Sequence, residues 1–230
     1  MLKPEPPLRL VIFDVDGTLI DSQRLILAAM RQAFAEAGLP APGDAVTLGI
    51  VGLSLPEAMA ALAPDLPAPA RDRLILCYKA SFLALRARIG GEAESPIYPG
   101  AREALGRLNR AGYLLSIATG KARRGLDHVL DSHGLRRFFI GTQTADDAPS
   151  KPHPGMVLNC LAATGVESAN AVVVGDSEFD MAMARAAGVR AVGVGWGYHP
   201  PERLRRGGAE HILADFDELD GVLGRILEQA

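Results

Sequence analysis

The stretch that decides the fold is residues 10–19, which read LVIFDVDGTL. Its first four residues are apolar, as in a strand buried on both faces of a parallel sheet. Gly17 supplies the backbone freedom for a tight turn just beyond this strand. Asp14 and Asp16 are two residues apart, so both carboxylates can face one pocket in an extended chain. Because two such carboxylates repel each other, the pattern predicts a cation beside them, although an Asx-type turn is the simpler alternative.

Length and composition are those of an ordinary globular protein. The chain has 230 residues, of which 48% are hydrophobic and 22% charged, and its formal net charge is −3. No long run of lysine or arginine is present, so neither nucleic acid nor an anionic membrane is indicated as a partner. Cys77 and Cys160 are far apart in apolar helical patterns, which fits a reducing compartment. Since no segment resembles a signal peptide or a membrane span, we expect a cytoplasmic protein.

Residues 22–93 show helical patterns and no strand-like run. Asp21 and Ser22 are expected to cap a first helix, and further helices are expected over Leu55–Leu62 and Arg71–Ile89. From residue 97 onward, by contrast, strand and helix patterns alternate. We therefore expect an all-helical cap over residues 22–93, inserted into an α/β core made of residues 1–21 and 94–230.

The alternating part of the chain predicts a mostly parallel, doubly wound, Rossmann-like sheet. The expected strand order is 5-4-1-2-3. Ligands of such sheets bind at the carboxyl ends of the strands. The expected strands, in chain order, are Leu10–Phe13, Tyr113–Ala118, Phe138–Gly141, Ala171–Val174, Arg190–Val194 and His211–Leu213.

Several polar residues follow the ends of these strands. Each has an ordinary explanation: Thr119 as a helix cap, Lys151 as a solvated loop residue, and Asp176 and Asp180 as a cap and a first-turn acid. Their joint placement at one rim makes a shared active site the better interpretation. The candidates are Asp14, Asp16, Thr119, Lys151, Asp176 and Asp180.

The motifs resemble those of phosphatases of the haloacid dehalogenase superfamily. Residues 14–19 (DVDGTL) match the first motif, Thr119 the second, residues 151–154 (KPHP) the third and residues 175–180 (GDSEFD) the fourth. The correspondence covers nearly the whole chain. The helical insert is similar to the small cap of the phosphoglycolate-phosphatase-like subgroup.

This resemblance implies a phosphoric monoester hydrolase that uses Mg²⁺ and acts on a small phosphorylated metabolite, phosphoglycolate or a similar ester. Asp14 is the implied nucleophile, which forms an aspartyl-phosphate, and Asp16 is the implied general acid and base. The implied magnesium ligands are Asp14, the Asp16 carbonyl and Asp176, with Asp180 as a ligand or as support for one.

The same resemblance assigns the phosphate-binding groups. Thr119 and the Gly120 amide are expected to bind phosphoryl oxygens, while Lys151 neutralises them and restrains the nucleophile. Gly52 lies in residues 49–54, where the family's cap presents a substrate-reading loop, although glycines are equally ordinary in a helix connection.

Three further features lie near the candidate site, and two of them allow two interpretations each. Lys121 can reach phosphate or be solvated, and residues 196–199 (WGYH) can border the pocket or pack a loop, of which we favour packing. His153 is assigned no catalytic role.

Other classes can be tested against particular residues. A dinucleotide fingerprint would need glycine where Tyr198 stands, and a P-loop would need glycine at Leu115 and serine or threonine at Ala122. Dehalogenases of the superfamily generally lack the second acid, which is present as Asp16. Sugar-phosphate mutases usually carry a cap histidine, and residues 22–93 contain none. A mutase and a non-catalytic protein that binds a phosphorylated ligand remain the alternatives, and the oligomeric state is not readable.

Overall fold

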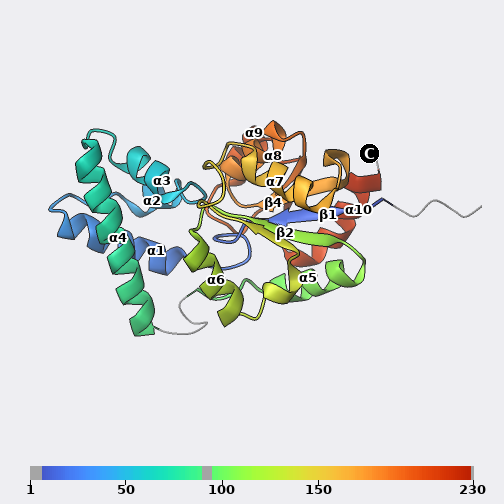
Figure 1. Ribbon diagram of the computed structural model, residues 1–230, viewed down its shortest axis with the longest axis horizontal. Coiled ribbons are helices and arrows are strands. Elements are labelled where there is room, and N and C mark those ends of the chain that lie inside the picture. The colour runs from blue at the N-terminus through green and yellow to red at the C-terminus, as the bar shows by residue number, and fades with distance from the viewer. Residues whose placement is uncertain (1–6, 90–94, 229–230) are drawn as a thin grey trace, which may run out of the picture.

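A computed structural model describes residues 7–89 and 95–228 of the chain. In these residues, a six-stranded sheet with helices on both faces forms one end of the molecule, and the helices α1 to α4, within residues 23–89, form the other (Figure 1). The predicted boundary between residues 93 and 94 lies outside the described residues. Within the described residues, no helix combines the length and apolar character needed to cross a membrane.

The sheet is entirely parallel, and its order is β3-β2-β1-β4-β5-β6. The prediction of a parallel doubly wound sheet is thus confirmed, but the observed order differs from the predicted 5-4-1-2-3. Read from the other edge it is 6-5-4-1-2-3, because the three-residue β6 pairs with β5 and becomes the edge strand. The strands are β1 (Leu10–Phe13), β2 (Leu114–Ala118), β3 (Gly141–Gln143), β4 (Ala171–Gly175), β5 (Arg190–Val194) and β6 (His211–Leu213).

The prediction of a strand over Phe138–Gly141 is wrong. Residues 136–138 form a 3₁₀ turn and the strand begins only at Gly141. The predicted strand includes two phenylalanines, which are common in strands. Phe139, however, packs against the core from outside the sheet, with its ring edge-on to that of Phe13 and 6.5 Å between the ring centroids. The true strand is a half-exposed edge of small and polar residues, which carries no apolar pattern.

Two helical layers cover the sheet, and the alternation of side chains along β1 shows why. Val11 and Phe13 join one apolar cluster, whereas Leu10 and Ile12 join the other, since successive strand residues face opposite sides. All four side chains are fully buried, which stabilises the fold by about 1.5–3 kcal/mol each. The first layer contains α5 (Ala101–Arg110), α6 (Arg123–Ser132) and α10 (Leu219–Glu228), and the second contains α7 (Gly155–Thr164), α8 (Glu178–Ala186) and α9 (Pro201–Gly207).

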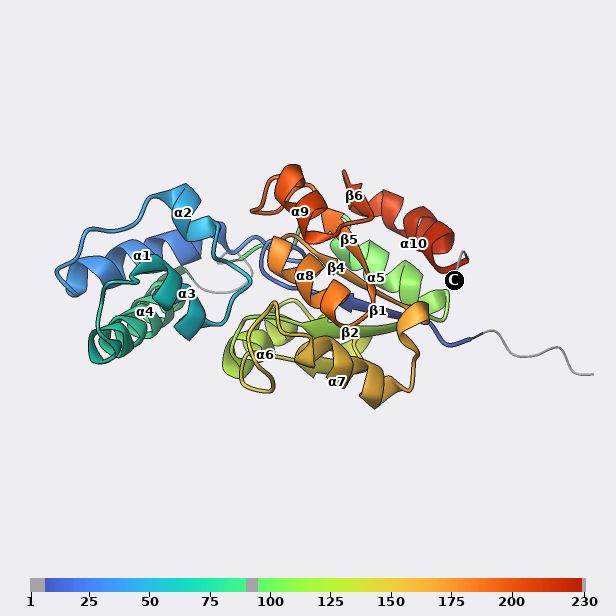
Figure 2. The ribbon, with the colours of Figure 1, turned by 90° about the horizontal axis from the view of Figure 1, so that it is seen from above.

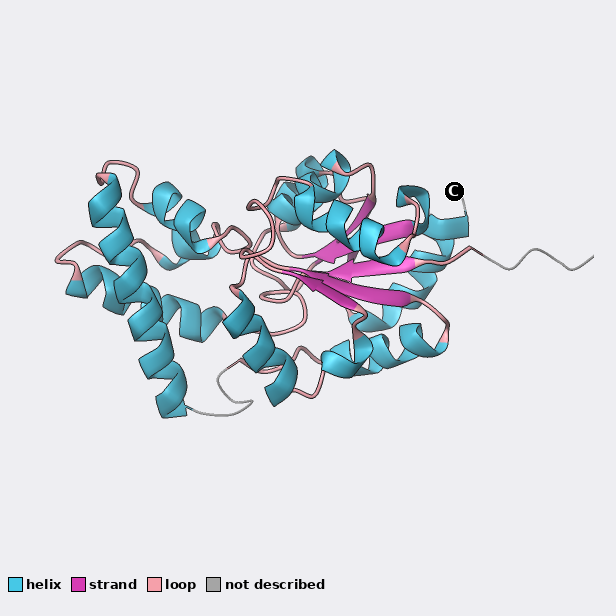
Figure 3. Ribbon diagram, in the orientation of Figure 1, coloured by secondary structure: helices cyan, strands magenta, loops and turns pink. Residues whose placement is uncertain are grey.

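The other four helices lie beyond the carboxyl ends of the strands (Figures 2 and 3). They have their own apolar cluster, which includes Phe34, Met59 and Leu74. The short helix over residues 44–48 has no counterpart among the predicted helices. The domain division drawn from the sequence stays a prediction, but this helical segment (residues 23–89) is the part of the chain that faces the candidate site. Its helices are α1 (Gln23–Glu36), α2 (Asp44–Leu48), α3 (Leu55–Leu62) and α4 (Ala68–Ile89).

Candidate active site

The ends of three neighbouring strands bring the first candidate residues to one place. Phe13 of β1 is in register with Ile117 of β2 and Val174 of β4. The next residue, Asp14, donates its amide to the Val174 carbonyl at 2.9 Å. Thr119 and Asp176 follow the two flanking strands at nearly the same level, so the sheet itself positions these side chains at its carboxyl edge.

Lys151, in the loop before α7, joins two of the carboxylates. Its Nζ lies 2.8 Å from Asp14 Oδ1 and 2.6 Å from Asp180 Oδ1, and all three side chains are buried. Burial alone would lower the pKa of Lys151, but the charges of Asp14 and Asp180 outweigh it and raise that pKa above its ordinary value. The lysine is therefore a fixed positive charge that also restrains Asp14.

Asp14, Asp176 and Asp180 form a buried acidic cluster, in which oxygens of the three carboxylates lie within 4.8 Å of one another. Burial, opposed by Lys151 and reinforced by Asp180, raises the pKa of Asp14 to about 7. Burial and the negative charge of Asp14 raise the pKa of Asp176 well above its ordinary value. Three acids forced together in this way form a site that a cation would stabilise.

The free lone pairs decide which of these acids fit a metal ion. Asp180 is fully engaged, since one oxygen meets Lys151 and the other accepts bonds from the Ser177 amide and hydroxyl at 3.1 and 2.6 Å. Asp14 accepts from Lys151 through Oδ1, and Asp176 accepts single bonds from Thr18 Oγ1 and the Tyr198 amide. Asp14 and Asp176 thus fit the role of ligands, and Asp180 fits a supporting role.

Glycine is required where the backbone approaches Asp176. A Cβ at Gly17, which has φ +82°, or at Gly197 would overlap the Asp176 side chain. The turn of the first motif and the loop after β5 therefore enclose this carboxylate closely. Trp196 in that loop donates its indole N–H to the Thr18 carbonyl at 3.1 Å and packs beside Phe216, whereas Gly197 and the Tyr198 amide border Asp176. The preference for packing over a pocket border in residues 196–199 therefore stays a prediction.

Asp16 lies in a second polar group beside the acidic cluster. Ser22 Oγ donates to Asp16 Oδ1 at 2.5 Å, and Lys121 Nζ lies 3.0 Å from Asp16 Oδ2. The prediction that Ser22 caps α1 is wrong for its side chain, because Asp21 accepts from the Gln23 amide instead. Sequence reasoning missed Ser22 because a serine before a helix has the same pattern in either role.

The loop of residues 49–54 touches the core at the candidate site. Gly52 has φ +107°, and a Cβ there would lie 2.9 Å from Ser177 Oγ. A Cβ at Gly120 would overlap the carbonyl oxygens of Gly52 and Leu53. The Ser54 amide also donates to Ser150 Oγ at 2.8 Å. This loop of the helical segment is therefore packed against the loops of the second, third and fourth motifs.

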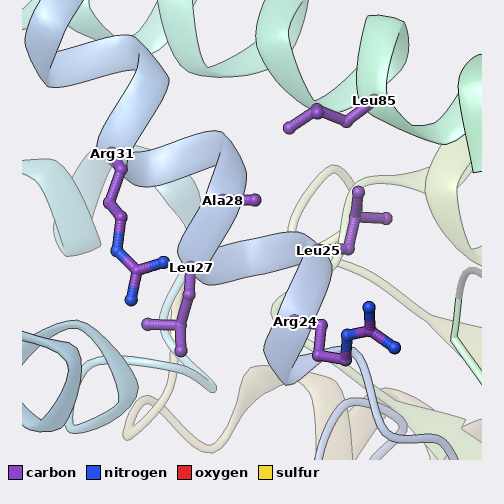
Figure 4. A pocket seen from close by; sticks show the side chains of 6 residues that line it. All are labelled: Arg24, Leu25, Leu27, Ala28, Arg31 and Leu85. Carbon is purple, nitrogen blue, oxygen red and sulfur yellow. The ribbon is translucent and has the colours of Figure 1, made fainter.

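Two pockets are lined by none of the three acids of the cluster, although Lys151 lines the second. One of about 290 Å³ is apolar, and its lining residues, including Arg24, Leu27 and Arg31, belong to α1 apart from Leu85 of α4 (Figure 4). The other, of about 630 Å³, lies between α3 and residues 149–153. Its lining includes the exposed His153, whose Nδ1 accepts from the Gly155 amide at 3.1 Å.

Comparison with known proteins adds to this geometry. The family described as haloacid dehalogenase-like hydrolase matches residues 11–194. "Probable phosphatase IndB" of Dickeya dadantii is 32% identical over 221 residues and covers 95% of both chains. The phosphoglycolate phosphatase of Mesorhizobium japonicum is 30% identical over 226 residues, with 96% of this chain and 97% of the relative covered.

A solved structure of a hydrolase from Pseudomonas syringae superposes with a TM-score of 0.81 at 25% identity, over 93% of this chain and 97% of that one. The match to the family spans most of the chain, and both relatives cover it almost completely. The chain therefore belongs to the haloacid dehalogenase-like hydrolase family and, within it, to the phosphoglycolate-phosphatase-like subgroup.

Proposed function

We propose that the protein is a Mg²⁺-dependent phosphatase that hydrolyses a small phosphate monoester through an aspartyl-phosphate. The observation that carries the proposal is the pairing of Asp14 with Lys151 inside the cluster that also holds Asp176. This arrangement offers a nucleophile, a fixed cation and a second acid in one buried place. Acting as a phosphoric monoester hydrolase also agrees with the names of its relatives.

In the first half of the proposed reaction, one Asp14 oxygen attacks phosphorus and the bond from phosphorus to the alcohol oxygen breaks. Asp16 protonates the departing alcohol oxygen. In the second half, Asp16 takes a proton from water, the water oxygen bonds to phosphorus, and Asp14 is released with inorganic phosphate. Lys151 holds the nucleophile in place throughout through its 2.8 Å contact.

Thr119 and the Gly120 amide are proposed to bind the phosphoryl oxygens, and Gly52 is proposed to close over them. Asp14, the Asp16 carbonyl and Asp176 would hold the magnesium ion, with Asp180 as support. When bound, the ion offsets negative charge on the acids and on the phosphate. This is supported by the charge balance of the site, where four carboxylates face two lysines, so a divalent cation would neutralise the excess negative charge. The carboxylates are those of Asp14, Asp16, Asp176 and Asp180.

The substrate we propose is a small phosphorylated metabolite, with phosphoglycolate as the first candidate because several relatives carry that name. Cys77 and Cys160 are both free, which supports the proposed cytoplasmic location. A sugar-phosphate mutase is the second candidate, since such enzymes share the motifs, but the helical segment offers no histidine.

The test is phosphate release from 4-nitrophenyl phosphate and from a panel of small phosphate esters, with and without Mg²⁺. We expect turnover that requires the metal. Asp14→Asn should reduce kcat by about a thousandfold or more, because the near-isosteric amide is a poor nucleophile. A binding protein would release no phosphate from any ester, and substantial activity in the asparagine variant would identify another nucleophile.

A further inference from the structure

Lys121 places a largely buried ammonium group next to Asp16, and the proposed reaction does not use this group. The side chains of Lys121 and Asp16 are only 11% and 12% exposed, and Nζ lies 3.0 Å from Asp16 Oδ2. The lysine is therefore not a solvated surface residue. An ammonium group enclosed this far needs a countercharge, which Asp16 supplies in the structure.

Three contacts fix the path of this lysine. Its amide donates to Thr119 Oγ1 at 3.3 Å, and its carbonyl accepts from the Ala145 amide at 3.2 Å. Its stem passes so close to α6 that a Cβ at Gly125 would lie 3.0 Å from Lys121 Cγ. The backbone and the stem thus direct the ammonium group toward Asp16.

The helical segment closes the same space from the other side. Lys121 Nζ lies 5.6 Å from the ring centroid of Phe82 on α4, a distance typical of a cation–π contact. Tyr78, one turn earlier, has its ring 5.8 Å from that of Phe82. Burial and the negative charge of Asp16 raise the pKa of the Tyr78 hydroxyl above its ordinary value. Lys121 therefore lies between the acid of the core and an aromatic wall.

The position of Asp16 defines what part of a substrate reaches this space. If Asp16 protonates the departing oxygen, that oxygen must come within hydrogen-bond distance of its carboxylate. Lys121 Nζ is then roughly 6 Å or less from the same oxygen, since each step is about 3 Å. Substituents on the first carbons of the alcohol lie within reach of the lysine, whereas the phosphoryl group lies toward Asp14 and Lys151.

We propose that Lys121 binds a carboxylate carried by the leaving alcohol, about one or two carbons from the ester oxygen, with Phe82 covering the subsite. This inference rests on the proposed phosphatase function and narrows its substrates to short phosphorylated hydroxy acids. The aromatic wall and the buried lysine favour a compact anion over a sugar, whose many hydroxyls would need further polar partners.

The experiment compares two esters that differ only in the charge of the leaving group. These are 2-phosphoglycolate and 2-hydroxyethyl phosphate, assayed at fixed Mg²⁺ with wild type, Lys121→Met and Lys121→Arg. The ratio of kcat/KM for the acid ester to that for the neutral ester should fall about ten- to a hundredfold in the methionine variant. The arginine variant, which keeps the charge, should retain part of the preference.

A matched control separates a specific contact from general attraction of anions. Arg124 is exposed and lies three residues further along the same segment, so Arg124→Met removes an equal charge without touching Asp16. Its ratio should equal that of wild type. An equal loss of the ratio in Arg124→Met and Lys121→Met would overturn the proposal in favour of long-range electrostatics.

The remaining outcomes are also decisive. Equal losses for both esters in a Lys121→Met protein that melts like wild type would mean that the lysine serves the phosphoryl group or Asp16, and the proposal would be wrong. Wild type can be tested alone, since glycolate should inhibit more strongly than ethylene glycol at equal concentration. Failure of wild type to hydrolyse any ester would instead overturn the phosphatase function itself.

Discussion

At the scale of single residues, Lys151 is the group on which the acidic cluster most depends. It is 1% exposed and contacts Asp14 and Asp180, which are equally buried. Burying a charge without an opposite charge beside it costs free energy, whereas buried opposite charges in contact offset much of that cost. The stability of the folded chain and the position of Asp14, the proposed nucleophile, thus rest on the same side chain.

Lys151→Met should therefore lower the free energy of unfolding by about 3–5 kcal/mol, because it leaves two carboxylates buried without an opposite charge. Urea denaturation measured by circular dichroism checks this. The double variant Lys151→Met/Asp180→Asn removes one of those carboxylates and should recover part of the loss. A single-variant loss below about 1 kcal/mol would show that the cluster does not need the lysine for stability.

At the scale of elements, the loop of residues 49–54 can lie directly against the loop after β2 because Gly120 has no side chain. The carbonyls of Gly52 and Leu53 occupy the place where a Cβ would lie. The Ser54 amide adds a hydrogen bond to Ser150 Oγ at 2.8 Å. The loop thus links the helical segment to the candidate site by close approach and by this hydrogen bond.

Gly120→Ala should accordingly raise KM for a phosphate ester by about tenfold or more while changing the melting temperature little, since the clash falls between two elements rather than inside the core. Steady-state kinetics and thermal denaturation together check this. Gly224→Ala in α10 is the control, because a Cβ there meets open space and should stabilise by about 0.5–1 kcal/mol. Unchanged kinetics in Gly120→Ala would place the two loops apart in the working enzyme.

At the scale of the whole molecule, strands and loops far apart in sequence place negative charge around one point. Asp14 and Asp176 are separated by 162 positions in the sequence yet share a cluster with oxygens within 4.8 Å. Binding of a divalent cation to the folded state alone would raise its stability by mass action. Magnesium should therefore affect folding as well as turnover.

Saturating Mg²⁺ should raise the melting temperature of wild type. At a free Mg²⁺ concentration of about a hundred times the dissociation constant, the free energy of unfolding should rise by about 2.7 kcal/mol. Asp176→Asn should lose this response, whereas the exposed Asp65→Asn should keep it. Differential scanning fluorimetry against metal concentration gives the answer. Equal shifts in all three proteins would mean that the ion binds elsewhere.

Acid should destabilise the fold in part through His199. Burial, followed by the charge of Arg203, lowers the pKa of this imidazole from 6.5 to about 4. The unfolded chain therefore binds a proton below about pH 6.5 that the folded chain refuses until about pH 4, so stability is present above this window and falls as pH falls through it.

His199→Asn should remove that part of the pH dependence while its side-chain oxygen still accepts the Glu178 amide, which now donates to His199 Nδ1 at 3.2 Å. Urea denaturation at about pH 7.5 and about pH 5 should show wild type losing roughly 1–2 kcal/mol more than the variant. Parallel losses in the two proteins would place the acid sensitivity in other groups.

Much of the architecture follows from patterns that lie within short stretches. The apolar run of residues 10–13 and the alternation of strand and helix after residue 97 sufficed for a parallel α/β sheet, because burial of such strands on both faces requires continuous apolar sequence. The edge strand at Gly141 could not be found in this way, since a strand that is half exposed needs no apolar residues.

The sequence by itself determined the parallel α/β class, the helical character of residues 23–89 and the acidic motifs, since periodicity and turn chemistry are local properties. Only the tertiary structure decided that Lys151 meets Asp180 as well as Asp14, that Ser22 and Lys121 turn to Asp16, and that Gly120 touches Gly52. Each of these contacts joins segments whose distance depends on how helices and loops pack. A side chain's partner is set by that packing and not by its neighbours along the chain.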